Sequence, residues 1–239
     1  MSLKFDGKSA YLLPLRNKHG LSKYAPMELL TGAESEFSFC CRIKVDWDNI
    51  DLEKTGGVMA FNGQHTGIMT RKNEDGEFFI QVDVWTENKG ETECSQIFYR
   101  LPAGYKNEWM DVVFSVDQLN KKMILRVDEK GDVGYVSNEI ICTGNIVDYS
   151  SSLLWIGCCN ALDSCPEEDR WYFIGEISMV GFLTLYLSER QAISFFKENL
   201  TEFKDNIVSY SDMKKQTYFK VFDKSGNGNH LIKYSDEWM

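Results

Sequence analysis

The sequence predicts an all-β fold: a two-sheet antiparallel jelly-roll β-sandwich with one short helix near residues 188–200. Three observations lead to this fold class. Short runs alternate between apolar and polar residues, and Gly- or Asn-containing turns separate them. The third observation is size, since 239 residues with 43% hydrophobic content suit one large sandwich domain over residues 1–239. A domain of this length buries enough surface to hold its core without covalent links.

The strands are predicted from alternation with a period of two. The run 37–47 places apolar residues such as Phe37 between polar ones such as Ser38, and the run 111–117 repeats the pattern. Each predicts a strand with one dry face and one mostly wet face. Asp75-Gly76 predicts a type I′ hairpin turn, which needs positive φ at both central residues. Asn62-Gly63 and Lys89-Gly90 mark further turns.

The helix follows a buried strand. Residues 177–187 are mostly apolar but too few to span a bilayer, so a buried strand is predicted. Ser188 and Gln191 then have the spacing of a capping box, in which a hydroxyl and an amide satisfy two backbone donors. Behind them Ala192, Ile193 and Phe196 recur at helical spacing. A short amphipathic helix is therefore predicted to begin after Ser188.

Four motifs occur in an order that is more specific than any one of them. They are L-x-F-D-G at residues 3–7, W-x-D-V at 109–112, L-W-I-G at 154–157, and Gly175, Glu176, Ile177 followed by Leu187, Ser188, Ile193 and Phe195. Over residues 3–196 this order resembles the laminin-G-like and concanavalin A-like lectin and glucanase superfamily. The resemblance implies a jelly-roll sandwich that binds glycans on a concave sheet face and adjoining loops.

The C-terminal segment departs from that pattern. In the family a D-x-S-G-N-G-N-H turn precedes the F-D-G strand, whereas here it lies at residues 223–230, after the other motifs. We therefore expect residues 204–239 to return, with 219–222 or 229–234 beside the N-terminal strand at 3–13. The turn also matches the first half of an EF-hand loop, but Tyr234 stands where that loop needs a glutamate, so a plain turn is favoured.

Composition limits the partners. The net charge is −10 and no basic cluster stands out, so neither nucleic acid nor an anionic membrane surface is an expected partner. The sequence has no run of eighteen apolar residues, so no membrane span is predicted. Its N-terminus lacks the apolar region of a secretory signal. Seven cysteines, an odd number, lie partly within strand-like runs. They favour reduced thiols and cytoplasmic synthesis, compatible with a virion or surface assembly.

The strand at residues 78–85 carries the main binding prediction. Its alternation places Phe79, Gln81, Asp83 and Trp85 on the face opposite the core. Aromatic rings beside amide and carboxylate groups suit the apolar faces and hydroxyl edges of sugars. The alternative is that Trp85 is covered by a loop and only adds to packing. A polar turn formed by Asn62, Gln64 and His65 is expected to rim the site.

A metal site is a second hypothesis. In the acidic loop 160–170, Asp163, Glu167 and Asp169 offer the carboxylate oxygens that Ca²⁺ prefers, although such charge runs are more often solvated loops. Asp46, Asp48 and Asp51 have the same two interpretations. Calcium also occurs in the family that the chain resembles, but no ligand set can be placed residue by residue.

Catalysis is not predicted. The E-x-D-x-E triplet of sandwich glucanases is absent, as is the sialidase box, although glycoside hydrolysis needs a suitably spaced carboxylate pair. The favoured function is a non-catalytic, lectin-like module that binds a glycan or glycoconjugate. One alternative is a structural or adhesion domain of a virion, fibre or surface assembly, with other copies of itself or assembly proteins as partners. The other is a glycoside hydrolase or lyase with an unfamiliar carboxylate pair.

Overall fold

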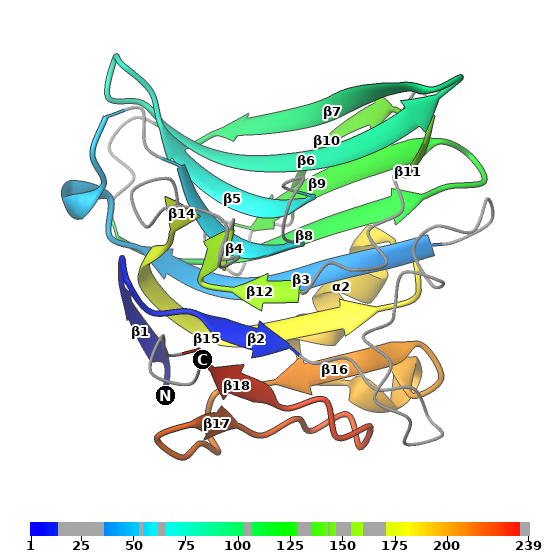
Figure 1. Ribbon diagram of the computed structural model, residues 1–239. Coiled ribbons are helices and arrows are strands. Elements are labelled where there is room, and N and C mark those ends of the chain that lie inside the picture. Colours follow the sequence, from blue (N-terminus) through cyan, green and yellow to red (C-terminus); the bar gives the residue numbers. More distant parts are fainter. Residues whose placement is uncertain are drawn as a thin grey trace.

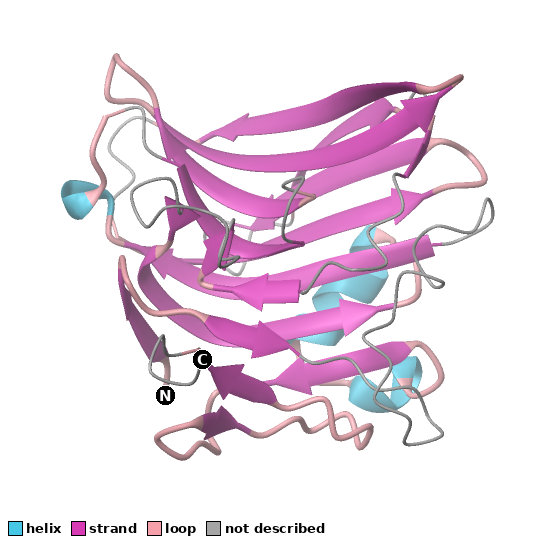
Figure 2. Ribbon diagram, viewed as in Figure 1, coloured by secondary structure: helices cyan, strands magenta, loops and turns pink. Residues whose placement is uncertain are grey.

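A computed structural model describes residues 1–13, 36–52, 55–61, 66–102, 107–128, 135–142, 144–146, 154–159 and 171–234. Two β-sheets stack face to face, and their strands pair antiparallel except at one bridge between β14 and β4 (Figure 1). Strands and loops make up most of the described chain, with helix confined to short segments (Figure 2). The predicted antiparallel sandwich is confirmed.

Sheet A has seven strands. Its order is β1 (Leu3–Asp6), β15 (Ile174–Leu183), β3 (Glu36–Val45), β8 (Trp109–Asp117), β9 (Lys122–Asp128) and β10 (Val136–Ile141). The seventh, β16 (Ile207–Ser211), pairs with β15 beyond the end of β1. The predicted buried strand at 177–187 thus lies inside this sheet as β15, between β1 and β3, and it ends at Leu183.

Sheet B has eleven strands. The main order is β7 (Glu91–Arg100), β6 (Phe78–Asn88), β5 (Gly67–Lys72), β4 (Thr55–Phe61), β12 (Leu154–Ile156), β2 (Tyr11–Leu13), β18 (Leu231–Lys233) and β17 (Lys220–Val221). In addition, β11 (Asn145–Ile146) pairs with the end of β6, and the pair β13 (Cys158–Cys159) and β14 (Trp171–Tyr172) joins β4.

The main core lies between the sheets and is rich in phenylalanine. Phe39 of sheet A contacts Phe61 of sheet B with ring centroids 5.7 Å apart, and it also contacts Phe37, Phe114 and Phe182. All five rings are at most 1% exposed. Burying a ring of this size removes more apolar surface from water than any aliphatic side chain does, so these residues contribute strongly to the stability of the sandwich.

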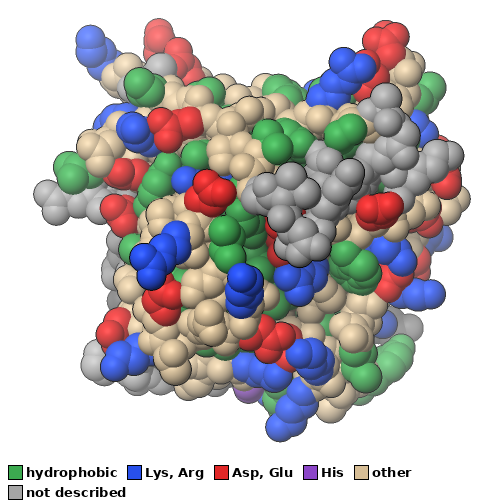
Figure 3. Space-filling model, turned by 180° about the vertical axis from the view of Figure 1, so that it is seen from behind, with side chains coloured by type: hydrophobic (Ala, Val, Ile, Leu, Met, Phe, Trp, Pro, Cys, Tyr) green, Lys and Arg blue, Asp and Glu red, His purple; other side chains and the backbone are tan. Residues whose placement is uncertain are grey.

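Part of the second face of sheet A is buried, whereas the sequence predicted a mostly wet face. Cys40 and Val113 are fully buried there because α2 (Glu189–Phe196) packs against them, and Ser38 is fully buried where its hydroxyl bonds to the backbone of Leu185 and Leu187. Gly181 permits this approach, since a Cβ at that position would lie 2.3 Å from the Phe195 ring. Away from this second core, acidic and basic side chains intermingle on the side seen in Figure 3, and hydrophobic ones form small separate groups.

The capping box of α2 is confirmed. The Ser188 hydroxyl accepts a hydrogen bond from the Gln191 backbone N–H, and the Gln191 side chain accepts one from the Ser188 backbone N–H. The α-helix ends at Phe196, and a separate 3₁₀ turn, η3 (Leu200–Phe203), follows it. Another 3₁₀ turn, η1 (Trp47–Asn49), follows β3.

The hairpin turns correct one prediction. Asp75-Gly76 does lie between two paired strands, but only Gly76 has positive φ, and the loop closes by a bond from the Gly76 N–H to the Asn73 carbonyl. It is therefore not a type I′ turn. Lys89 and Gly90 instead have φ of 54° and 85°, and they form a two-residue loop between the paired residues Asn88 and Glu91. This is where the positive-φ pair expected of a type I′ turn lies.

The D-x-S-G-N-G-N-H segment is a hydrogen-bonded turn. Both carboxylate oxygens of Asp223 accept hydrogen bonds, from the backbone N–H groups of Tyr210, Ser225 and Asn229 and from the Ser225 hydroxyl. Asn227 and Asn229 donate to carbonyls of β16. The turn leads into β18, which pairs antiparallel with β2. These bonds occupy the oxygens that an EF-hand loop would offer to a cation.

Candidate functional site

The β6–β7 hairpin carries the predicted binding face. Its register places Asp83 opposite Gln96, Gln81 opposite Phe98, and Phe79 opposite Arg100. These pairs share the sheet face that points away from the core, because Ile80, Val82 and Val84 alternate with them and fill the core. We refer to this surface, made of Phe79, Gln81, Asp83, Gln96, Phe98 and Arg100, as the hairpin face.

A buried polar cluster lies at the centre of the hairpin face. The Gln81 amide donates to both carboxylate oxygens of Asp83, at 2.9 and 3.0 Å, and the Gln96 amide donates to Asp83 Oδ1 at 3.1 Å. Asp83 is 4% exposed and Gln81 5%. Burial raises the pKa of Asp83 to about 6, although the two amide donors act in the opposite direction. Asp83 thus orients Gln96 from behind and is not open to a ligand.

The accessible part of the hairpin face belongs to β7. Phe98 is 41% exposed, and its ring meets Phe79 edge-on with centroids 6.3 Å apart. Gln96 is exposed on one side of Phe98, and Arg100, which pairs with Glu77, is exposed on the other. Sequence reasoning missed these three residues. The two-residue Lys89-Gly90 turn holds the signal, because it fixes which β7 residue lies opposite each β6 residue.

Trp85 differs from the rest of the predicted platform. Its side chain is half-buried and packs against the main core, and its Nε1 is buried without a hydrogen-bond partner among the described residues. Its backbone N–H donates to the Thr66 hydroxyl at 3.3 Å. The structure therefore places Trp85 in the packing of the sandwich. Asn62, Gln64 and His65, which were expected to rim this site, lie outside the described residues.

Two cavities have linings that adjoin, because Asp46 of one donates its backbone N–H to the carbonyl of Ile174 in the other. The larger has a volume of about 390 Å³. It is lined by Lys4, Phe5, Asp6, Lys44, Val45, Asp46, Asn107, Gly175 and Glu176. The smaller, which we call the end cavity, has a volume of about 170 Å³. Its lining is Gly7, Asn49, Ile50, Asp51, Thr55, Gly56, Trp171, Tyr172 and Ile174.

The carboxylates of the larger cavity are bonded within the protein. Glu176 accepts from Ser2 and pairs with Lys44 at 2.9 Å, and these two contacts lower its pKa. Asp6 accepts from two backbone N–H groups, and Asp46 accepts from the Asn49 amide at 2.8 Å. A ligand entering this cavity would have to displace those partners.

Metal ligation finds no support in the described part of the chain. No group of three His, Cys, Asp or Glu side chains there is arranged to hold a metal ion. The predicted calcium ligands Asp163, Glu167 and Asp169 lie outside the described residues. Six cysteines lie in the described part of the chain, and five of them are buried. None of the described helices has the length and apolar character needed to cross a membrane.

Two carboxylate pairs lie opposite each other across neighbouring strands on the second face of sheet A, Glu36 with Asp117 and Asp111 with Asp128. Asp111 and Asp128 are directly opposite across β8 and β9, and each is 8% exposed. Arg42 binds both oxygens of Asp111, at 2.6 and 2.8 Å. Burial raises the pKa of Asp111, while Arg42 opposes that rise. Neither Asp111 nor Asp128 lines either of the two cavities described above.

Comparisons with known proteins show the fold. No family model matches the chain, and no curated protein sequence matches it. A Bacteroides ovatus protein described as a candidate carbohydrate-binding protein aligns with 98% of this chain at a TM-score of 0.54 and 14% identity. The enzymatically active domain of tailspike protein 2 from bacteriophage CBA120 aligns with 87% of it at 0.53 and 13% identity. The chain spans 60% of the first protein's length and 32% of the second's.

Proposed function

We propose that this protein is a non-catalytic carbohydrate-binding module that holds a glycan against the exposed part of the hairpin face. The observation that carries the proposal is the neighbourhood of Phe98, an exposed ring with an oriented amide on one side and a guanidinium on the other. The similarity in fold to a protein described as carbohydrate-binding agrees with the proposal.

The chemistry of this surface matches a sugar. The Phe98 ring offers an apolar face to the C–H groups of a pyranose, and Phe79 supports that ring from the side. Gln96 uses one N–H for Asp83, which leaves its carbonyl oxygen and second N–H for sugar hydroxyls. Arg100 adds further donors. Because Asp83 fixes Gln96, little side-chain freedom is lost on binding.

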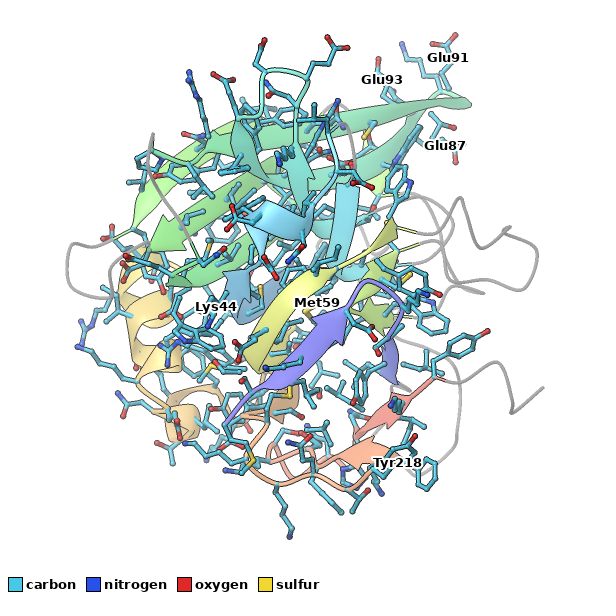
Figure 4. All side chains as sticks on the ribbon, turned by 90° about the vertical axis from the view of Figure 1, so that its left-hand side faces the viewer. Lys44, Met59, Glu87, Glu91, Glu93 and Tyr218 are labelled. Atoms are coloured by element: carbon cyan, nitrogen blue, oxygen red, sulfur yellow. The ribbon has the colours of Figure 1, made fainter. Side chains whose placement is uncertain are left out.

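A glycan array tests the proposal. Wild type is compared with Phe98→Ala and with the matched control Tyr218→Ala. Tyr218 is 74% exposed and lies at the opposite extremity of the molecule from the hairpin tip marked by Glu87, Glu91 and Glu93 (Figure 4). We expect wild type and Tyr218→Ala to bind the same glycans, and Phe98→Ala to lose them. Absence of any wild-type binding, or equal binding by all three proteins, would contradict the proposal.

The non-catalytic part of the proposal is tested separately. Array glycans that bind wild type are incubated with the protein and analysed for cleavage by mass spectrometry. We expect them to remain intact, because Asp111 and Asp128 are both buried and Asp111 is bonded to Arg42. Cleavage that Asp111→Asn abolishes, with folding preserved, would establish an enzyme instead.

A further inference from the structure

The end cavity differs from the larger cavity in whether its polar side chains are already hydrogen-bonded. The side chains of Asp51 and Thr55 make no hydrogen bond or ion pair with any described residue, whereas the carboxylates of the larger cavity are already bonded. Asp51 is exposed, so its ionised carboxylate faces the solvent with its acceptor sites open. A ligand that brings hydroxyl donors gains hydrogen bonds here without breaking existing ones.

Two aromatic residues form a wall of the end cavity. Trp171 and Tyr172 make up β14, which pairs with the fully buried Cys158 and Cys159 of β13. Trp171 also packs against the small cluster formed by Ala60, Met69 and Cys159. This part of the lining is therefore held by strand pairing and by packing, so little reorganisation is needed when a ligand binds against it.

The charge of the described lining favours a neutral ligand. Among the described residues that line the end cavity, Asp51 is the one carboxylate, and there is no lysine or arginine. The protein also has a net charge of −10, so an anionic ligand is repelled. A ligand that has neighbouring hydroxyl groups, an apolar ring face and no charge would match this lining. A neutral sugar has all three properties. The volume of about 170 Å³ is small beside the roughly 300–1,000 Å³ typical of ligand pockets, which favours a single ring.

The end cavity is separate from the hairpin face. One row of paired residues connects them across sheet B, from Phe98 through Gln81, Met69 and Gly57 to Tyr172. Four strand spacings amount to about 19 Å. Met69 is fully buried and Gln81 nearly so, so no open surface runs along this row from one region to the other.

We propose that the end cavity is a second sugar site, which takes one neutral monosaccharide unit with its ring against Trp171 and Tyr172 and adjacent hydroxyls on Asp51. This inference rests on the proposed carbohydrate-binding function but concerns a different site. It makes the protein bivalent, and two weak sites that engage one branched or surface-bound glycan raise the overall affinity without new contacts.

Ligand-observed NMR titrations with the methyl glycosides of glucose, galactose and mannose test the proposal. The variant is Asp51→Asn, with Asp48→Asn as the matched control, because Asp48 is also an exposed acid, within η1, but does not line the cavity. We expect at least one glycoside to bind wild type, Asp48→Asn and Phe98→Ala alike, and Asp51→Asn to weaken binding by about tenfold or more.

A second variant, Trp171→Ala, removes the wall, and its melting temperature shows whether the fold is kept. The inference is overturned if none of the glycosides binds, or if Asp51→Asn binds as wild type does. Loss of array binding in Phe98→Ala combined with either result would leave the proposed function standing and remove only the second site. If wild type binds no array glycan but binds a glycoside in a way that depends on Asp51, the second site would stand and the proposed site on the hairpin face would be removed.

Discussion

Asp83 on the hairpin face and Asp51 in the end cavity are both carboxylates placed near aromatic rings, yet their surroundings differ. Asp83 is 4% exposed and accepts hydrogen bonds from two glutamine amides, whereas Asp51 is exposed and has no described hydrogen-bond partner. Alternation along a strand determines which sheet face a side chain occupies. Accessibility depends also on the neighbouring elements, which a single strand does not reveal.

The largest expected effect concerns the pH dependence of stability through Asp83. Burial raises its pKa from 3.8 to about 6, so the folded protein binds a proton that the unfolded chain releases between these values. Its contribution to stability is fully present below about pH 4 and is lost as pH rises through 6, by about 3 kcal/mol. Urea unfolding from pH 4 to 7 of wild type and Asp83→Asn measures it. If the difference in free energy of unfolding between wild type and Asp83→Asn does not change with pH, the raised pKa of Asp83 would be contradicted.

Trp85→Ala comes next. Because this ring packs against the main core, we expect the free energy of unfolding to fall by about 2–3 kcal/mol. Tyr218→Ala removes an aromatic ring that is 74% exposed and should cost no more than about 0.5 kcal/mol. Denaturant unfolding compares them. Equal free energies of unfolding for wild type and Trp85→Ala would contradict this packing role. They would support the sequence prediction that Trp85 belongs to an open binding face.

Gln96→Ala sharpens the role of the hairpin face. The substitution removes the exposed amide that Asp83 orients, so we expect the affinity for an array-positive glycan to fall about tenfold. The set of glycans that bind should change little. Isothermal titration calorimetry measures the affinity. Asn120→Ala serves as the control, because it also removes an amide bonded to an aspartate, here in the β8–β9 turn. An unchanged dissociation constant for Gln96→Ala would exclude this amide from the site.

Asp51→Asn is expected to have the smallest effect on stability. An exposed carboxylate with no described hydrogen bond or ion pair contributes little to folding, so the free energy of unfolding should change by less than about 0.5 kcal/mol. Thermal unfolding followed by circular dichroism at neutral pH checks this. A clearly larger loss would show that Asp51 has a structural role and would remove the contrast with Asp83.

The sequence was sufficient for the fold because its local signals agree. The period-two runs became β3 and β8, and the capping box became the start of α2. Two predicted details were wrong: the wet face of β3 for a tertiary reason, and the type I′ turn at Asp75-Gly76 for a local reason. Cys40, on the face of β3 that was predicted to be wet, is buried because α2 packs on it, and Asp75-Gly76 lies in a longer loop than a type I′ turn allows.

The candidate site was predictable only in part. Strand alternation gives the common face of Phe79, Gln81 and Asp83, and the Lys89-Gly90 turn would have given Gln96 and Phe98 as their partners. The end cavity combines residues near positions 7, 51 and 171, which only the folded chain brings together. Calcium binding, an assembly role and cytoplasmic synthesis stay predictions, because no contact among the described residues tests them.

The most direct test of the hairpin face follows the side-chain amide of Gln96 in ¹⁵N-labelled protein. Its resonance is identified by its disappearance in Gln96→Ala, and an array-positive glycan is then titrated into wild type. The account predicts a saturable shift of this amide that is lost in Phe98→Ala. A bound glycan that leaves the Gln96 amide unmoved while shifting signals elsewhere would contradict it.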